Sequence, residues 1–412
     1  MGKLFKIALR NLLRYKRRTL LTASLITVGV VFVLVFMAVS GSFKNMMIGQ
    51  ITDSMLGHAQ VHRRGYVASI DNLPLNLNLR AGAAQRIGTV LNAQPGVAAW
   101  SPRIKFGGMF SNFAETTNIR LNAVYPEKEF AVVPLLPSRI HDGVKEIKRG
   151  EILVPDLLAK GMKVGVGDVV VVVATNKDGS VNGKQFKVGG LLESVTGPGG
   201  RDGYIHFDDG VEVLRMEEPE VSEVAIRLRE FDGLHDFTKA LGALLAQELN
   251  EEGAPIFEVH AWEQLSPFFN IARMIDVMTL FIRLMLVAIV LISITNVMIM
   301  AVYERIREIG TIAAIGTPPG RILNMFIIEG FCLGIIGAAI GAVVGTAVVS
   351  IITLSRISFD FGMQQGLVLQ ARVNPRDLVV ISATVIVVAV IASLQPAFKA
   401  SRMEPIEALR HV

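Results

Sequence analysis

Cysteine is almost absent from this chain of 412 residues, and histidine is scarce. Cys332 is the only cysteine and lies in a long apolar run, so a disulfide within the chain is excluded, and with it a redox function based on paired thiols. Of the seven histidines, His58 and His62 come nearest to a metal-binding pattern, in the segment HAQVH. This segment lacks the glutamate of HExxH and is predicted to be a strand, so the sequence does not support metal chemistry.

A phosphate-binding loop is also missing from the sequence. The pattern GxxxxGK[ST] does not occur, and its nearest approach, from Gly179 to Lys184, has the wrong spacing and is followed by Gln185. The chain is therefore not expected to bind ATP through such a loop, and we predict neither an enzymatic activity nor a cofactor for it.

Acidic residues are absent from the first 43 positions, which carry seven of the 41 lysines and arginines. Removing these seven leaves 34 basic residues against 36 acidic ones, so the rest of the chain is nearly neutral. A nucleic-acid-binding domain needs a basic patch in its folded part, and no nucleic acid is therefore expected as a partner. The basic cluster indicates membrane topology instead.

Apolar residues are abundant: 51% of the chain is hydrophobic, 19% is charged, and the mean hydropathy is +0.48. A helix needs about 20 apolar residues to cross a bilayer. The first apolar run is longer than the core of a signal peptide, and no convincing cleavage site follows, so we expect an uncleaved anchor. Four transmembrane segments are predicted, the second with a stalk at its outer end: 19–43, 274–303, 324–354 and 378–397.

The positive-inside rule places the N-terminus in the cytoplasm, and four crossings return the C-terminus to the same side. On the cytoplasmic side we expect a basic amphipathic helix lying on the lipid bilayer, a helix with a turn, and a tail, at 1–18, 304–323 and 398–412. On the outer side we expect a folded domain at 44–273 and a loop at 355–377.

The outer domain is predicted to be α+β, which makes the fold class a four-helix membrane protein with a large α+β domain inserted between the first two spans. Alternation of apolar and polar residues predicts strands near 58–62, 151–154, 168–174, 185–191 and 223–228, and helices near 83–93 and 234–249. Two lobes are expected, one formed by about 44–100 plus 218–265 and the other by 101–217.

The segment ERIREIG, which begins at Glu304, follows the second span directly. Glu304 and Glu308 are four residues apart, which would place them on one face of a helix, and isoleucines recur on another face. An ordinary solvated loop held by salt bridges would carry the same charges. The pattern favours a short amphipathic helix at the membrane boundary that fits a groove of a partner.

Five glycines of the third span, Gly330, Gly334, Gly337, Gly341 and Gly345, allow another helix to approach closely. The neighbour is predicted to be a helix of the same chain, with a dimer contact as the alternative. Glu329 lies near the cytoplasmic end of this span, and we expect a structural role for it, paired with Arg321 or with a neighbouring chain, rather than a place in an ion path.

Several stretches of the sequence resemble the FtsX-like and MacB-type ABC transporter permeases. They are ALRNLLRYKRRTLLT near the start, ILVPDLLAKGMKVGVGDVVVVV in the outer domain, the segment NVMIMAVYERIREIGTIAAIGTPPG, and the closing FKASRMEPIEALR. A permease with a large outer domain and without a fused ATPase domain is most similar to the lipoprotein-releasing branch of this family. The resemblance covers nearly the whole chain and implies a multi-pass protein of the bacterial inner membrane whose large domain lies in the periplasm.

What the resemblance implies about partners is specific. A separate cytoplasmic ATPase would bind ATP and Mg and contact Glu304, Arg305, Arg307, Glu308, Ile309 and Gly310. A second permease, identical or related, and a periplasmic carrier or adaptor would complete the assembly.

The function predicted on this basis is extraction of lipoproteins from the inner membrane, driven by ATP hydrolysis in the partner. Efflux of a peptide or drug through a tripartite assembly, and signalling to a periplasmic hydrolase, remain alternatives. Bulky apolar side chains in the outer halves of the first two spans are candidate contacts for acyl chains, although core packing explains them equally: Phe32, Phe36, Met37, Met285, Leu286 and Ile289.

Overall fold

The structure, a computed structural model, describes residues 7, 10–195, 199–250, 253–361 and 364–404. Of the amphipathic helix predicted at 1–18, residues 1–6 and 8–9 lie outside the described residues. The closing PIEALR at 405–410 also lies outside them. The chain divides into two compact units, which are described separately. The first comprises 1–44, 273–358 and 368–412, and the second 45–272 and 359–367.

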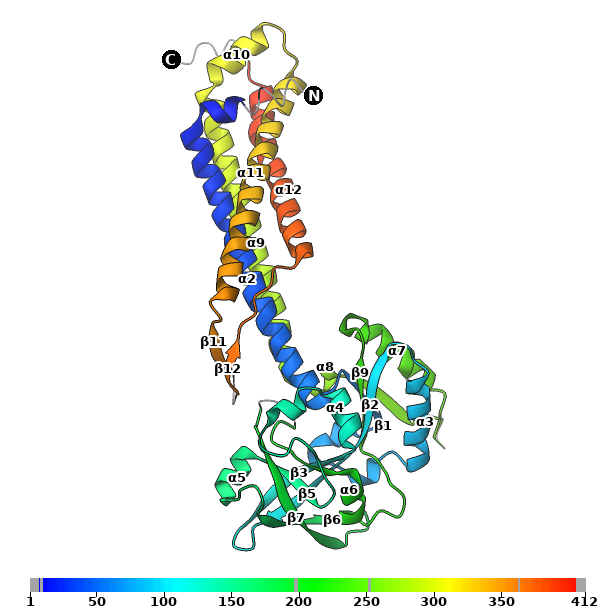
Figure 1. The fold of residues 1–412 in the computed structure, drawn as a ribbon. Coiled ribbons are helices and arrows are strands. Elements are labelled where there is room, and N and C mark those ends of the chain that lie inside the picture. The colour runs from blue at the N-terminus through cyan, green and yellow to red at the C-terminus, as the bar shows by residue number, and fades with distance from the viewer. Residues whose placement is uncertain (1–6, 8–9, 196–198, 251–252, 362–363, 405–412) are drawn as a thin grey trace. The chain divides into compact units, whose positions relative to one another are not determined.

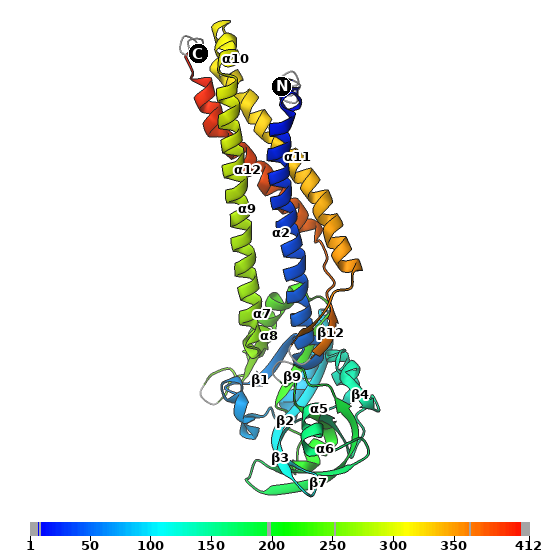
Figure 2. The same ribbon diagram turned by 90° about the vertical axis from the view of Figure 1, so that its left-hand side faces the viewer.

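Long apolar helices dominate the first unit. Within the described residues, four helices are long and apolar enough to cross a membrane, with mean hydropathies of 2.4 to 2.7 in their most apolar windows. They are α2 (Lys16–Ile51), α9 (Phe268–Glu304), α11 (Pro319–Leu354) and α12 (Pro375–Ser401). Figures 1 and 2 show these helices side by side, with the short α10 (Ile306–Ala314) at the same end as the N-terminus.

The helix ends follow local sequence rules. Proline at the first position of α11 and of α12 has its φ already fixed for a helix and has no backbone N–H to leave unpaired. The Asn374 side chain caps α12 by accepting a hydrogen bond from the Arg376 N–H at 3.0 Å. Between α10 and α11 the chain turns at Gly316, whose φ of +88° favours glycine.

The glycines of α11 pack against helices of the same chain, which confirms the predicted intramolecular contact. A Cβ added at Gly330 or Gly334 would lie 2.6 or 2.7 Å from Ser393 or Ala389 of α12. Further along α11, Gly337, Gly341 and Gly345 face Ile26, Val30 and Leu34 of α2, and a Cβ at Gly337 would come within 2.5 Å of Ile26. Glycine therefore sets the spacing of α11 from both neighbours.

The second unit is built on a mixed sheet of ten strands within the described residues, in the order β10-β1-β9-β2-β3-β8-β5-β7-β4, with β6 paired to β2 and β7. The pairs β3–β8 and β5–β7 are parallel, and the other pairs are antiparallel. The strands are β1 (Ala59–Arg63), β2 (Val97–Ser111), β3 (Thr116–Val124), β4 (Ile140–Gly143), β5 (Glu151–Pro155), β6 (Val169–Thr175), β7 (Val181–Leu192), β8 (Gly203–His206), β9 (Glu223–Leu228) and β10 (Phe257–Ala261).

Short helices cover this sheet and enclose one large apolar core. They are α3 (Ala81–Asn92), α4 (Pro126–Val132), α5 (Asp156–Met162), α6 (Phe207–Val213), α7 (Leu234–Leu245) and α8 (Trp262–Leu265), with a π-helical turn at Thr52–Leu56 and 3₁₀ turns at Val67–Asn72, Leu75–Leu77, Leu136–Arg139 and Phe231–Gly233. Figure 1 shows α3 and α7 side by side, and Arg86 at α3 pairs with Glu248, just after α7, at 2.7 Å.

Strand β2 connects the two halves of the sheet. Its first half pairs with β9, and its second half pairs with β3 and β6. The lobe boundary predicted at residues 100 and 101 lies inside this strand, near Arg103, where the pairing of β2 changes from β9 to β3. The predicted outer loop at 355–377 contains two short paired strands, β11 (Ser358–Phe361) and β12 (Gln364–Val368).

Candidate functional site

The predicted partner-binding helix begins later than expected. Helix α9 ends at Glu304, α10 begins at Ile306, and Arg305 between them has a non-helical backbone with φ −110° and ψ 17°. Glu304 and Glu308 are therefore not on one continuous helix, and the prediction that they share a face is wrong. The break has a physical cause, since Arg305 turns its side chain into the bundle.

Arg305 makes a buried ion pair with Glu329 of α11. Arg305 Nη1 lies 2.8 Å from Glu329 Oε1, and the two side chains are only 2% and 1% exposed. The same Glu329 oxygen accepts a hydrogen bond from Asn11 Nδ2 at 2.8 Å, and the ring of Tyr15 lies 4.7 Å from the guanidinium carbon. The predicted pairing of Glu329 with Arg321 is wrong, although the structural role predicted for Glu329 agrees with this contact.

The six predicted coupling residues divide into a buried and an exposed group. Ile309 and Gly310 are buried, like Arg305. Glu304, Arg307 and Glu308 are exposed. Glu308 Oε1 lies 3.3 Å from Nη1 of Arg14, an ion pair in which both side chains face solvent.

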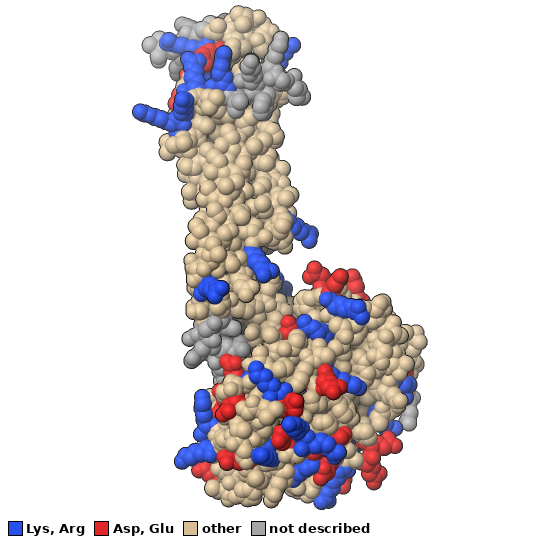
Figure 3. Space-filling view, viewed as in Figure 1, with Lys and Arg blue, Asp and Glu red and all other residues tan. Residues whose placement is uncertain are grey.

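Sequence reasoning missed two residues of the exposed face. Thr311 and Ile315 follow Glu308 at helical spacing, and Ile315 is 78% exposed. The sequence signal for Ile315 is an apolar residue that directly precedes Gly316 and follows Glu308 by seven positions, which is two helical turns. Figure 3 shows charged side chains gathered at this end of the bundle and none on the middle of the visible face.

The candidate substrate contacts are divided between the core and the surface of the bundle. Leu286 is 4% exposed and packs against Gly29 of α2, so it belongs to the core. Phe36 and Met37 are half-buried. Phe32, Met285 and Ile289 are 61%, 62% and 42% exposed and form part of the outer surface of α2 and α9.

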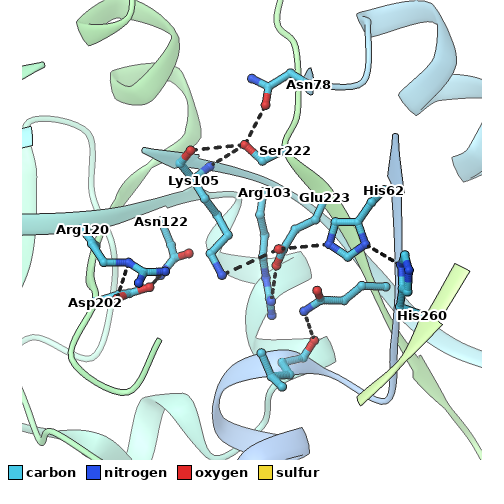
Figure 4. A network of polar contacts seen from close by, with 12 residues as sticks. His62, Asn78, Arg103, Lys105, Arg120, Asn122, Asp202, Ser222, Glu223 and His260 are labelled. Carbon is cyan, nitrogen blue, oxygen red and sulfur yellow. Dashed lines mark hydrogen bonds and ion pairs between the residues drawn. The ribbon is translucent and has the colours of Figure 1, made fainter. Parts of the chain in front are cut away.

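The second unit holds a buried network of charged side chains, drawn in Figure 4. Arg103 of β2 lies between two fully buried carboxylates, at 2.8 Å from Glu129 and 2.9 Å from Glu223. Glu223 also lies 3.7 Å from Lys105 and 3.6 Å from His62. Burial alone would raise the pKa of Glu223, but Lys105, His62 and Arg103 hold this pKa well below its usual range.

Both histidines of the segment HAQVH make polar contacts inside the second unit. His62 lies 3.3 Å from His260 between Nδ1 atoms, and burial lowers the pKa of His260. His58 Nδ1 accepts a hydrogen bond from the Leu228 N–H at 3.1 Å. Among the described residues no group of three or more His, Cys, Asp or Glu side chains is placed to hold a metal ion.

The fold and this arrangement define a membrane permease with four spanning helices and a large sheet domain between the first two. Residues 280–405 match the FtsX-like permease C-terminal domain, and residues 19–244 match the MacB-like periplasmic core domain. The chain belongs to the FtsX-like ABC transporter permeases that carry a MacB-like periplasmic core domain. The predicted family and fold class are thereby confirmed.

Individual relatives are similar to this chain at modest identity. The lipoprotein-releasing system transmembrane protein LolC of Xylella fastidiosa is 25% identical over 71% of this chain and 72% of its own. LolC of Neisseria meningitidis serogroup B is 23% identical over 98% of both chains. The macrolide export ATP-binding/permease protein MacB of Nitrobacter winogradskyi is 27% identical over 46% of this chain and 27% of its own.

Proposed function

We propose that this permease couples ATP hydrolysis in a separate cytoplasmic ATPase to movement of its periplasmic domain, and that it extracts lipoproteins from the inner membrane. Similarity to LolC over 98% of both chains supports the lipoprotein substrate. The observation that carries the coupling step is the exposed side of α10, which has charged residues in its first turn and the exposed Ile315 directly after its last residue. ATP and Mg would be bound by the ATPase, and a second permease and a periplasmic carrier would complete the system.

The exposed face of α10 has the composition of a small docking surface. Ile315 presents an apolar side chain directly after the helix, and Arg307 and Glu308 in its first turn present charges of both signs. Apolar anchors supply most of the affinity at interfaces, whereas charges at the rim set orientation and partner choice. Ile315 is therefore the anchor in this proposal.

Replacing Ile315 with aspartate is expected to weaken association with the ATPase about 30-fold, the effect of removing an interface residue worth about 2 kcal/mol. Insertion into the membrane should stay normal, because the side chain is 78% exposed in the permease itself. Co-purification of the ATPase with the tagged permease, and the rate of ATP hydrolysis in the complex, measure the effect.

The control is Val181→Asp, which changes an exposed apolar residue (61%) of β7 in the sheet domain, away from the membrane spans. This variant should retain the ATPase. If Ile315→Asp also retains a fully stimulated ATPase, α10 is not the docking element and the proposal fails.

The substrate class can be tested with a photo-crosslinking residue at Met285, which is 62% exposed on α9. If lipoproteins leave the membrane along this surface, Met285 should capture a lipoprotein before ATP hydrolysis and release it afterwards. Leu286 is the matched control, because it is the next residue but is buried against α2. Capture of only a second permease at Met285, in cells rich in lipoproteins, would contradict the lipoprotein proposal.

Efflux is the second candidate function, and the similarity to a macrolide exporter favours it. The two functions share the coupling step and differ in what leaves the membrane. Loss of lipoprotein capture together with intact ATPase coupling would therefore favour efflux.

A further inference from the structure

At the cytoplasmic end of the bundle, two polar contacts meet at one buried carboxylate. Glu329 of α11 binds Arg305, at the break between α9 and α10, and Asn11, in the segment before α2. Tyr15 of the same segment stacks on the Arg305 guanidinium. The carboxylate thus joins three parts of the chain that are distant in sequence.

The apolar contacts around this carboxylate join the same parts. Leu12, Ile309 of α10 and Phe326 of α11 belong to one buried cluster. The turn at Tyr15 is fixed by the Thr19 hydroxyl, which donates a hydrogen bond to the Leu12 carbonyl at 2.8 Å. Helix α10 is therefore attached to α11 and to the segment before α2, in addition to its chain connection to α9.

A buried ion pair is weak evidence for stability, since well-packed apolar residues of similar volume often stabilise a site equally well or better. The better-supported role of such a pair is to specify one geometry. Here the geometry is the direction of α10, because Arg305 leaves the helical backbone to reach Glu329. Moreover, Nε and Nη2 of Arg305 are buried and have no hydrogen-bond partner among the described residues, so within that part of the chain Arg305 is held through Nη1 and the Tyr15 ring.

We propose that Glu329, Arg305 and Asn11 are positioning residues that make α10 and the segment before α2 move as one when the ATPase pulls on α10. This inference rests on the proposed coupling to an ATPase. Arg305 then has a different role from the predicted one, since it aims the docking helix instead of touching the partner. Force on α10 reaches α11 through Glu329 and α2 through Asn11, in parallel with α9.

The test separates ATPase binding from ATPase stimulation in the full-length permease, purified with the ATPase that associates with the wild type. Asn11→Ala removes one hydrogen bond to the buried carboxylate and leaves the exposed face of α10 intact. We expect this variant to bind the ATPase as the wild type does and to stimulate ATP hydrolysis about tenfold less, the factor that corresponds to about 1.4 kcal/mol.

Asn11→Asp should be worse than Asn11→Ala, because it places a second carboxylate beside Glu329. Adding Glu329→Gln to Asn11→Asp exchanges donor and acceptor and keeps one negative charge near Arg305, so stimulation should recover. The control is Thr295→Val, which removes a hydrogen bond of 3.2 Å from α9 to the Ala392 carbonyl of α12 without touching the segment before α2. This control should retain full stimulation.

Full stimulation by Asn11→Ala would overturn the inference, and so would an equal loss in Thr295→Val, which would mean that loosening any helix contact has the same effect. Thermal unfolding of each purified variant shows whether a loss of ATPase stimulation comes from misfolding. If Asn11→Ala misfolds, the double variant Asn11→Asp with Glu329→Gln replaces it as the test. Recovered stimulation in the double variant supports the inference, and unrecovered stimulation overturns it. Failure of the proposed function itself looks different, because the wild-type permease would then neither bind nor stimulate an ATPase.

Discussion

Replacing Arg103 with alanine is expected to lower the free energy of unfolding of the sheet domain by about 3–5 kcal/mol, because it leaves two buried carboxylates without their shared counter-ion. Arg103 is 2% exposed, and the side chains of Glu129 and Glu223 are fully buried. Both tryptophans of the chain, Trp100 and Trp262, lie in this unit, so the fluorescence of the full permease during urea titration reports on its unfolding.

Arg149→Ala is the control for this experiment, because the ion pair of Arg149 with Asp208 is exposed and 3.7 Å long. Its loss should change the free energy of unfolding by less than about 1 kcal/mol. Equal effects of the two variants would mean that the buried network does not stabilise the domain.

The loss of unfolding free energy caused by Arg103→Ala also depends on pH, and the direction of this dependence follows from the lowered pKa of Glu223. The pKa of Glu223 is lowered in the folded state, so its contribution is fully present above the unfolded value of about 4.3 and is lost as the pH falls towards the folded value. The difference between wild type and variant should therefore be largest near neutral pH and should shrink in acid. A difference that grows in acid would contradict the role assigned to this carboxylate.

The membrane helices and part of the sheet could be predicted because their signals are local. Apolar runs identify α2, α9, α11 and α12, and period-two alternation identifies strands such as β6, in which Val170 and Val172 are buried. Strands β2, β3, β4, β8 and β10 were not predicted. In β2 the alternation is obscured because Arg103 and Lys105 occupy buried positions.

Arg103 and Lys105 can be buried only because their charge partners, which are distant in the chain, are buried beside them. Glu223 neutralises Arg103 from 120 positions away, and no local pattern records that pairing. The burial of Arg305 has the same origin, since its partner Glu329 is on another helix and Asn11 is 318 positions from that glutamate. The assumption that a charged residue is exposed is therefore correct for Glu308 and wrong for Arg305.

Replacing Gly337 with leucine is expected to separate α11 from α2 and to lower the free energy of unfolding of the helix bundle by about 3 kcal/mol, the upper end of the usual effect of overpacking. A Cβ at this position would already lie 2.5 Å from Ile26 Cγ2 and 2.7 Å from Ile26 Cβ, and Ile26 is fully buried. Thermal unfolding of the purified permease in detergent, together with its amount in the membrane, measures the effect.

Ala347→Leu provides the matched control, because it adds three carbons to an exposed position of the same helix. It should be tolerated, since nothing in the described bundle has to move for it. The same pair of variants also distinguishes the two interpretations of the glycine face. If this face were a dimer contact, Gly337→Leu would leave the single permease stable and abolish only its association with a second copy, as seen by size-exclusion chromatography. The packing of Gly337 on Ile26 requires the opposite result, a permease that is destabilised even as a monomer.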